Sequence, residues 1–280
     1  MRTEVNAHML AAARWPRVVA RAGLTVFLLV IGAFILAPVV IVFLESFTSA
    51  GYVSFPPRGF SLHWYSAVFD SGSPFGGAFF LSLRVSALVA CVACVIGCGA
   101  AFAIVRYRFL GRTPLRALVL SPIALPGLVL GVSLLNLSAR LALPVNQWTI
   151  LAGQAALTTP FIFQLIGAQL AGLDLNLERA ARSLGASSLR VFQSVTLPLV
   201  RLGLVSGVVF AFVLSFDDAV VALFLTAPGA TTLPVEMVAY TSNNFGPIVV
   251  AAGSLLIIVG MIGVIIVDRI FGIAKVFGLD

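Results

Sequence analysis

The sequence predicts an all-α membrane protein with six transmembrane helices and both termini in the cytoplasm. Of its 280 residues, 60% are hydrophobic and only 10% are charged, which is more apolar surface than a soluble domain of this size could bury. The apolar stretches are continuous runs of roughly 20 residues, the length that crosses about 30 Å of hydrocarbon as a helix. Because these runs do not alternate with polar residues, helices are favoured over a closed barrel.

The positions of the basic residues predict the orientation. Among 17 arginine and lysine residues, only Arg58, Arg84 and Arg140 fall in segments assigned to the outside. Cytoplasmic loops carry the excess of positive charge in membrane proteins, so both termini are assigned to the cytoplasm. The net charge of +7 therefore reflects orientation in the membrane and does not indicate nucleic acid as a partner.

The chain begins with residues 1–22, which form a basic lead-in on the cytoplasmic side. The first predicted span covers residues 23–44; it is too long for the apolar core of a signal peptide, so we expect it to remain as a helix. The loop that follows, residues 45–77, is polar. Its Trp64 and Tyr65 are side chains that suit a membrane–water interface.

The second predicted span covers residues 78–105, and four arginines follow it as a strong cytoplasmic signal. The third span, residues 115–137, contains Pro122 and Pro126. A proline inside a span leaves a backbone carbonyl unpaired, which is tolerated where the carbonyl meets protein or a water-filled cavity. This span is therefore expected to contact other helices or a water-filled cavity.

The remaining predicted spans cover residues 148–170 and 199–225, and a sixth span ends near Val267. A polar segment, residues 226–246, separates the last two. No soluble domain is separable from this pattern. We therefore expect residues 1–280 to form a single transmembrane domain.

The most polar continuous piece of the chain is the cytoplasmic stretch of residues 173–198, between the fourth and fifth spans. Asp174 or Asn176 can cap a short helix there, because either side chain can accept from free backbone N–H groups. Gly185 can end this helix in the left-handed conformation. The stretch is therefore predicted to begin with an ordered helix and a tight turn.

A second short helix can open at Ser187 or Ser188, and Pro198 can occupy the first turn of the fifth span. Small and apolar side chains of the first helix recur at helical spacing and share one face. These are Leu177, Ala180, Ala181 and Leu184. Such a helix–turn–helix, with small residues on its face, suits docking on a partner protein.

The same stretch resembles the EAA loop of binding-protein-dependent ABC importer permeases, the MetI-like group. The resemblance implies that residues 173–198 form the coupling loop, which sits in a cleft of a cytoplasmic ATPase dimer. Arg179 stands at the position of the family's glutamate, and Glu178 precedes it by one residue. The residues that match the loop are Ala180, Ala181, Gly185, Val195, Leu197 and Pro198. The residues implied for ATPase coupling are Glu178, Arg179, Ala180, Ala181, Leu184, Gly185, Leu197 and Pro198.

Two adjacent acids, Asp217 and Asp218, lie inside the fifth span. An acid at membrane depth is costly unless it faces a cavity or a partner, so it indicates a functional site. Because successive helical residues point about 100° apart, the two carboxylates cannot share one face. Each of them either lines the substrate pathway or holds a local break in the helix.

Three further polar residues inside spans, Ser133, Asn136 and Gln164, are candidates for the substrate pathway. For Asn136 and Gln164 the alternative role is hydrogen bonding between helices. Cysteines 91, 94 and 98 fall on one helix face without a histidine or an acid beside them. Contacts between helices are therefore favoured there over a metal site, and no disulfide is expected.

The segment after the acid pair extends the family resemblance. Thr226-Ala227-Pro228-Gly229 and Thr231-Thr232-Leu233-Pro234 resemble the spermidine/putrescine permease subfamily. This resemblance implies polyamine as the substrate. Gly127 stands where that subfamily often carries an acid, and related permeases serve aminophosphonates, amino-acid-like compounds or ferric ion, so these substrate classes remain alternatives.

The chain has no phosphate-binding loop of its own, because Lys275 is its only lysine and lies at the C-terminal end. We therefore expect no enzymatic activity and no cofactor on this chain, with ATP and Mg²⁺ held by the partner ATPase. The resemblance further implies a second permease subunit, usually a paralogue, an extracytoplasmic substrate-binding protein, and the bacterial cytoplasmic (inner) membrane as the location.

An intramembrane protease and a secondary transporter or channel are the two other function classes open to such a chain. An intramembrane protease requires a Ser–His pair or two facing acids at membrane depth, but His8 and His63 lie outside the spans and the two aspartates are neighbours. A self-contained secondary transporter or channel requires ionisable groups in several spans. Only the fifth span offers obvious ones, so this class stays as the alternative.

Overall fold

A computed structural model describes residues 15–242 and 244–271, and all regular elements within these ranges are helices. The lead-in is described only from residue 15, where the first described helix, α2, begins. In order, the elements are α2 (Trp15–Glu45), α3 (His63–Phe69), α4 (Pro74–Arg106), α5 (Arg112–Ala124), α6 (Gly127–Arg140), α7 (Gln147–Gly172), α8 (Leu175–Ser183), α9 (Ser188–Val191), the π-helical turn η1 (Phe192–Thr196), α10 (Leu197–Asp217), α11 (Val220–Phe224), α12 (Leu233–Thr241) and α13 (Pro247–Phe271).

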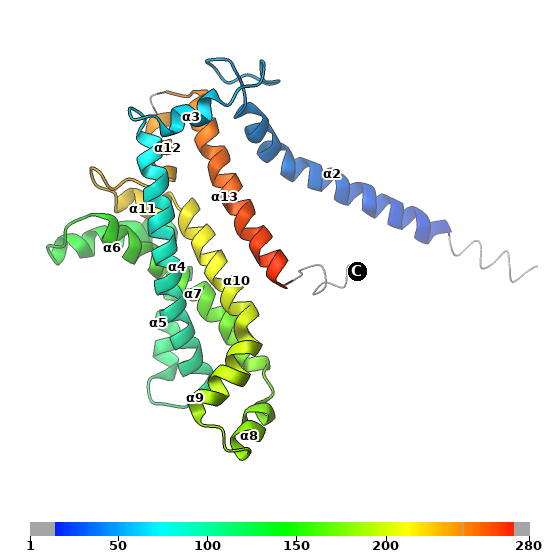
Figure 1. Cartoon of the computed structure of the whole chain (residues 1–280), viewed down its shortest axis with the longest axis vertical. Helices are drawn as coiled ribbons and strands as arrows, with labels where there is room; N and C mark the ends of the chain where they lie inside the picture. Colours follow the sequence, from blue (N-terminus) through cyan, green and yellow to red (C-terminus); the bar gives the residue numbers. More distant parts are fainter. Residues whose placement is uncertain (1–14, 243, 272–280) are drawn as a thin grey trace, which may run out of the picture.

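Helices α4, α7 and α10 form the centre of the molecule, with α8 and α9 at one end and α3 and α12 at the other (Figure 1). Ile162 of α7 is fully buried where the three helices meet. A Cβ atom on Gly97 of α4 would lie only 3.0 Å from the Ile162 side chain. Small residues at such a contact let helices approach closely, which is how helices associate in lipid.

Among the described residues, five helices are long and apolar enough to cross a membrane, and the bent pair of α5 and α6 makes a sixth span if it is counted as one. The predicted span over residues 115–137 is therefore a bent pair of helices that is broken near Pro126. The two helices meet at an angle of 113°. Leu125 between them is extended, with φ −94° and ψ 133°, a conformation that the following proline favours because it crowds the helical region of the residue before it.

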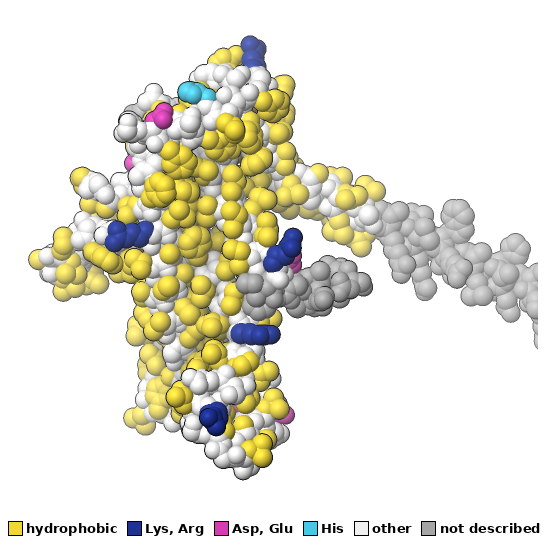
Figure 2. Space-filling model, viewed as in Figure 1, with side chains coloured by type: hydrophobic (Ala, Val, Ile, Leu, Met, Phe, Trp, Pro, Cys, Tyr) yellow, Lys and Arg dark blue, Asp and Glu magenta, His cyan; other side chains and the backbone are white. Residues whose placement is uncertain are grey.

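Helix α2 lies apart from the central bundle in Figure 1. No residue in the most apolar 18-residue stretch of its span, Gly23–Glu45, is buried. Hydrophobic side chains also cover much of the molecular face in Figure 2. Apolar surface of this extent is stable only against lipid or against another subunit.

The end of the molecule that carries α3 is held by a chain of hydroxyl groups. The Tyr65 hydroxyl oxygen lies 2.7 Å from Ser46 Oγ and 2.8 Å from Ser254 Oγ. Tyr65 thus joins the segment after α2 to α13. The predicted polar loop of residues 45–77 therefore contains one short helix, α3, fixed in place by its tyrosine.

Cys94 and Cys98 lie on one face of α4, with their Sγ atoms 3.9 Å apart. Both pack against the core that α4 shares with α7 and α10. Cys91 is exposed. Two of the three cysteines thus take part in helix packing.

Candidate functional site

Residues 173–198 fold into the predicted helix–turn–helix. Asp174 caps α8 by accepting from the Asn176 N–H at 2.9 Å. Gly185 ends the turn in the left-handed region, with φ +85°, a conformation that costs glycine nothing because it has no Cβ. Ser187 accepts from the Arg190 N–H and opens α9. Local capping chemistry therefore determines the shape of this stretch.

The stretch continues into the apolar helix α10 without a break. The π-helical turn η1 leads directly into α10, and Pro198, which has no N–H to donate, lies where π-helical bonding gives way to α-helical bonding. The helix that was expected to begin at residue 199 thus begins at Leu197. Any displacement of α9 is passed to α10 through continuous helical backbone.

Leucine side chains of the helix–turn–helix are uncovered. Leu184 is 88% exposed and Leu189 is 66% exposed. Leu177 and Ala180 are also exposed, and Ala181 is half-buried. An apolar surface that the chain itself does not cover is a mark of a protein interface.

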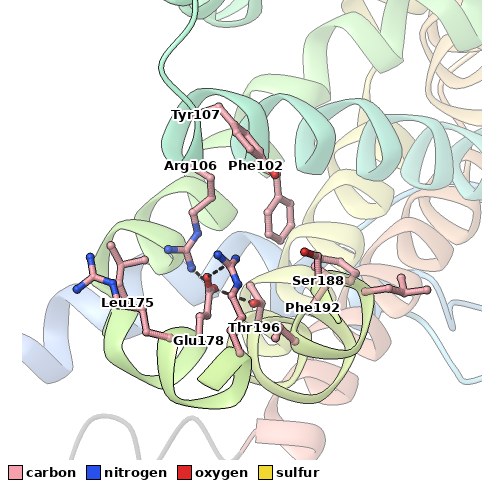
Figure 3. Close-up of a pocket in the computed structure, with 12 residues that line it drawn as sticks. Phe102, Arg106, Tyr107, Leu175, Glu178, Ser188, Phe192 and Thr196 are labelled. Carbon is pink, nitrogen blue, oxygen red and sulfur yellow. Dashed lines mark hydrogen bonds and ion pairs between the residues drawn. The ribbon is translucent and has the colours of Figure 1, made fainter. Parts of the chain in front are cut away.

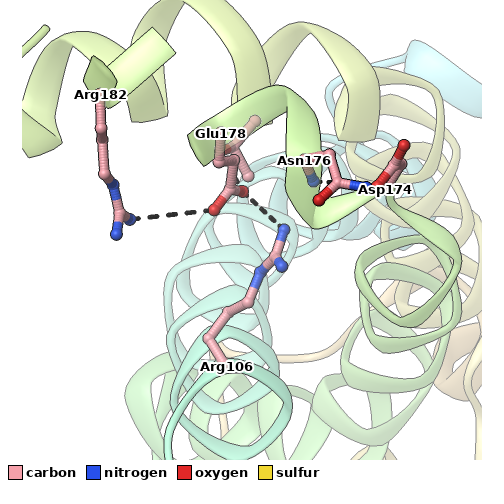
Figure 4. Close-up of polar contacts among 6 residues, drawn as sticks. Arg106, Asp174, Asn176, Glu178 and Arg182 are labelled. Carbon is pink, nitrogen blue, oxygen red and sulfur yellow. Dashed lines mark hydrogen bonds and ion pairs between the residues drawn. The ribbon is translucent and has the colours of Figure 1, made fainter. Parts of the chain in front are cut away.

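Glu178 points in the opposite direction, into the chain (Figures 3 and 4). Its Oε1 atom accepts from Arg106 Nη2 at 2.7 Å and from Thr196 Oγ1 at 2.8 Å. The side chains of Glu178 and Arg106 are each only 14% exposed. Arg182, one helical turn further along α8, lies 3.9 Å from Oε2 and is 59% exposed. Glu178 thus joins α8 to the end of α4 and to η1.

A pocket of about 720 Å³ lies beside this ion pair, between the end of α4 and the short helices α8 and α9. Figure 3 shows Phe102, Tyr107 and Phe192 on its walls. Arg179, at the position of the family's glutamate, is exposed at this pocket and donates to Asn176 Oδ1 at 3.4 Å. Arg179 and Glu178, neighbours in sequence, therefore have different surroundings.

Asp218 holds a break in the helix. It ends α10, and its two carboxylate oxygens accept from the backbone N–H groups of Val221 at 3.2 Å and Ala222 at 3.1 Å. These are free N–H groups in the first turn of α11, which has no partner for them within its own backbone. Of the two roles open for Asp218, the structure gives it this one.

A buried glutamine supports that break. Gln154 of α7 is fully buried, donates to Asp218 Oδ2 at 3.2 Å and accepts from Ser215 Oγ at 2.7 Å. Sequence reasoning singled out Gln164 and missed Gln154. Gln154 could have been recognised from its side-chain amide, because a glutamine inside an apolar run needs a hydrogen-bond partner on a neighbouring helix.

Asp217 faces away from this network. It is exposed at a groove of about 540 Å³ between α10, α12 and α13, with Met237, Thr241 and Ser242 among the lining residues. Within the described part of the chain its carboxylate has no hydrogen-bond partner. The helix break is thus held by Asp218 and not by Asp217, and a role of Asp217 in the substrate pathway stays a prediction.

The other pathway candidates are exposed but lie outside this groove. Asn136 donates to the Val132 carbonyl of its own helix at 2.9 Å. Ser133 and Gln164 are exposed on α6 and α7. The structure does not bring these three side chains together with Asp217.

Comparison with known proteins identifies the family to which the chain belongs. Residues 93–273 match the model of the family described as "Binding-protein-dependent transport system inner membrane component". The putrescine transport system permease protein PotI of Escherichia coli (strain K12) is 33% identical over 256 residues, which cover 88% of this chain and 90% of PotI. The spermidine/putrescine transport system permease protein PotC of the same strain is 30% identical, over 85% of this chain and 90% of PotC.

A solved structure shares the fold. In the crystal structure of a bacterial ABC transporter that imports the acidic polysaccharide alginate, one chain matches with a TM-score of 0.65 at 19% sequence identity. The match covers 88% of this chain and 92% of that chain. The chain therefore shares the helical fold of that transporter subunit.

The Asp218 cap leads to a prediction about stability. Asp218→Ala is expected to cost about 1–3 kcal/mol, because it leaves the buried donors of Gln154, Val221 and Ala222 without an acceptor. The thermal unfolding midpoint of the purified protein in lipid nanodiscs measures this. Asp217→Ala is the matched control and is expected to stay within about 0.5 kcal/mol of the parent. Equal shifts for both variants would contradict the assignment.

Proposed function

The chain belongs to the family of binding-protein-dependent transport system inner membrane components, and on that basis we propose that it is a permease subunit for polyamine import across the bacterial cytoplasmic membrane. It is an ABC importer permease of the MetI type and not an enzyme, since ATP is hydrolysed by a separate ATPase subunit. The polyamine substrate, the bacterial inner membrane and the identity of each partner are parts of the proposal.

The observation that carries the proposal is the uncovered apolar face of α8 and α9. Leu184 and Leu189 are the exposed leucines of a rigid, capped helix–turn–helix, which lies at one end of the central bundle (Figure 1). We propose that this end is cytoplasmic and docks in a cleft of an ATPase dimer. That dimer would hold ATP and Mg²⁺, and this chain would hold no cofactor.

A second permease subunit is part of the proposal, and by resemblance to the family it is a paralogue. The support is the apolar surface that α2 and the bundle leave uncovered. A substrate-binding protein would deliver solute at the opposite end, where α3 and α12 lie. Transport would follow when closure of the ATPase dimer moves the coupling loop.

Two observations support polyamine as the substrate. The relatives PotI and PotC carry putrescine and spermidine/putrescine in their names. Asp217 presents a carboxylate and Thr241 a hydroxyl to the same groove, groups that suit an alkylammonium ion. Aminophosphonates, amino-acid-like compounds and ferric ion are the alternative solutes, and a self-contained secondary transporter or channel is the alternative function.

The first test uses this chain reconstituted in lipid with its ATPase, its paralogous permease and its binding protein. ATP hydrolysis is expected to rise several-fold when the binding protein carries putrescine or spermidine, and to stay at the basal rate with unrelated solutes. Stimulation only by another solute would overturn the substrate class. If no ATPase associates with the chain, the importer proposal fails and the secondary transporter takes its place.

The second test addresses the Asp217 groove. Asp217→Asn removes the charge without changing the shape of the side chain, so polyamine uptake is expected to fall about tenfold, in line with losing a charge-assisted bond of about 1.5–3 kcal/mol. The basal rate of ATP hydrolysis is expected to stay the same. An equal fall in uptake and basal hydrolysis would give Asp217 a structural role instead.

The third test addresses the turn of the coupling loop. A Cβ at Gly185 would meet no atom within 4 Å, so a substitution there acts through backbone strain alone. Gly185→Val forces a β-branched residue into the left-handed region at a cost of about 1–2 kcal/mol, and substrate-stimulated ATP hydrolysis is expected to be largely lost. Gly185→Asn is the control, because asparagine tolerates this conformation. Full stimulation in the valine variant would contradict the role of the turn.

A further inference from the structure

We propose that the cluster of Arg106, Glu178 and Thr196 is the connection that transmits movement of the coupling loop to the two membrane helices α4 and α10. Glu178 is then a positioning residue that acts inside the permease rather than on the ATPase. This inference rests on the proposed function, because it assigns a task to the same loop.

The contacts of α8 single out Glu178. Within the described residues, the bonds from Glu178 to Arg106 and to Thr196 are the side-chain bonds that join α8 to any other element. The other side-chain bonds of α8 stay within that helix and its cap, such as Ser183 to the Arg179 carbonyl. The leucines of α8, Leu175 and Leu177, are 46% and 49% exposed, so apolar packing holds this helix only in part.

The bonds of Glu178 reach two different helices through one oxygen atom. Arg106 is the last residue of α4, and Thr196 immediately precedes α10. Both donate to Glu178 Oε1, at 2.7 Å and 2.8 Å. A movement of α8 therefore displaces the ends of both helices together.

Both helices also carry a polar anchor towards their far ends. On α4, Ser82 Oγ accepts from the Leu233 N–H at the start of α12 at 2.8 Å. On α10, Asp218 caps α11 and binds Gln154. A displacement at the Glu178 end is thus carried along the rigid backbone of α4 and α10 to the polar contacts at their opposite ends.

Burial makes the cluster sensitive to the loss of one charge. Glu178 and Arg106 are each 14% exposed, and Thr196 is 4% exposed. Removal of one partner leaves the other charge poorly solvated and free to seek new contacts. The cluster is therefore expected to behave as a unit, and its loss should break the connection without removing the docking surface.

The test uses the reconstituted transporter and measures polyamine transported per ATP hydrolysed. Glu178→Gln and Arg106→Gln are each expected to lower this ratio about tenfold, with basal ATP hydrolysis and co-purification of the ATPase unchanged. The double variant is expected to be no worse than either single variant, because residues in one network are not additive. Arg106→Lys, which keeps the charge, is expected to recover part of the ratio.

Arg108→Gln is the matched control. Arg108 lies two residues after Arg106, is exposed, and makes no bond in the described part of the chain, so the ratio is expected to equal that of the parent. If Glu178→Gln does not give a monodisperse protein, Thr196→Val is measured in its place, since it removes one bond without leaving a lone charge. An intermediate fall in the ratio, about threefold, is expected for it.

Three outcomes separate the possibilities. An unchanged ratio in Glu178→Gln, or in Thr196→Val where that variant replaces it, overturns the inference. Loss of ATPase co-purification in Glu178→Gln, but not in Arg106→Gln, also overturns it and places Glu178 at the ATPase contact. Failure of the parent itself to respond to substrate is a failure of the proposed function and is visible before any variant is made.

Discussion

The need to satisfy every backbone polar group inside the chain governs this structure, because lipid offers no hydrogen bonds in place of water. The long helices meet this need by themselves. Where the helical backbone stops, at Asp218, side chains replace the missing bonds: the carboxylate takes two N–H groups of α11 and Gln154 binds the carboxylate. The most costly polar residues of the bundle are thus found where the backbone is incomplete.

Polar clusters fix the helices α4 and α10 to their neighbours at both ends of the bundle. Glu178 joins the ends of α4 and α10 on one side, and Ser82 and Asp218 fix the same helices to α12 and α11 on the other. Between the clusters, packing around Ile162 is tight enough that the helices cannot slide freely. Rigid helices with specific bonds at both ends suit a protein that must transmit displacement.

The features that could be predicted from the sequence are those set by neighbouring residues. Asp174, Gly185 and Ser187 act within a few residues of their positions, so the helix–turn–helix followed from local chemistry. Contacts between residues far apart in the sequence could not be predicted. The inward direction of Glu178, for example, depends on Arg106, which lies 72 residues away. The sharp bend before α6 had a local signal in Pro126, but its 113° angle depends on tertiary packing.

The isolation of α2 has a consequence for biogenesis. Helix α2 is synthesised before the other described helices, yet the one it packs against most is α13, which is the last of them along the chain. At synthesis rates of about 5–20 residues per second the interval is on the order of tens of seconds. During that time α2 has no α13 to pack against, so its apolar span Gly23–Glu45 must be stable in lipid without that contact. Its insertion does not wait for the rest of the chain to fold.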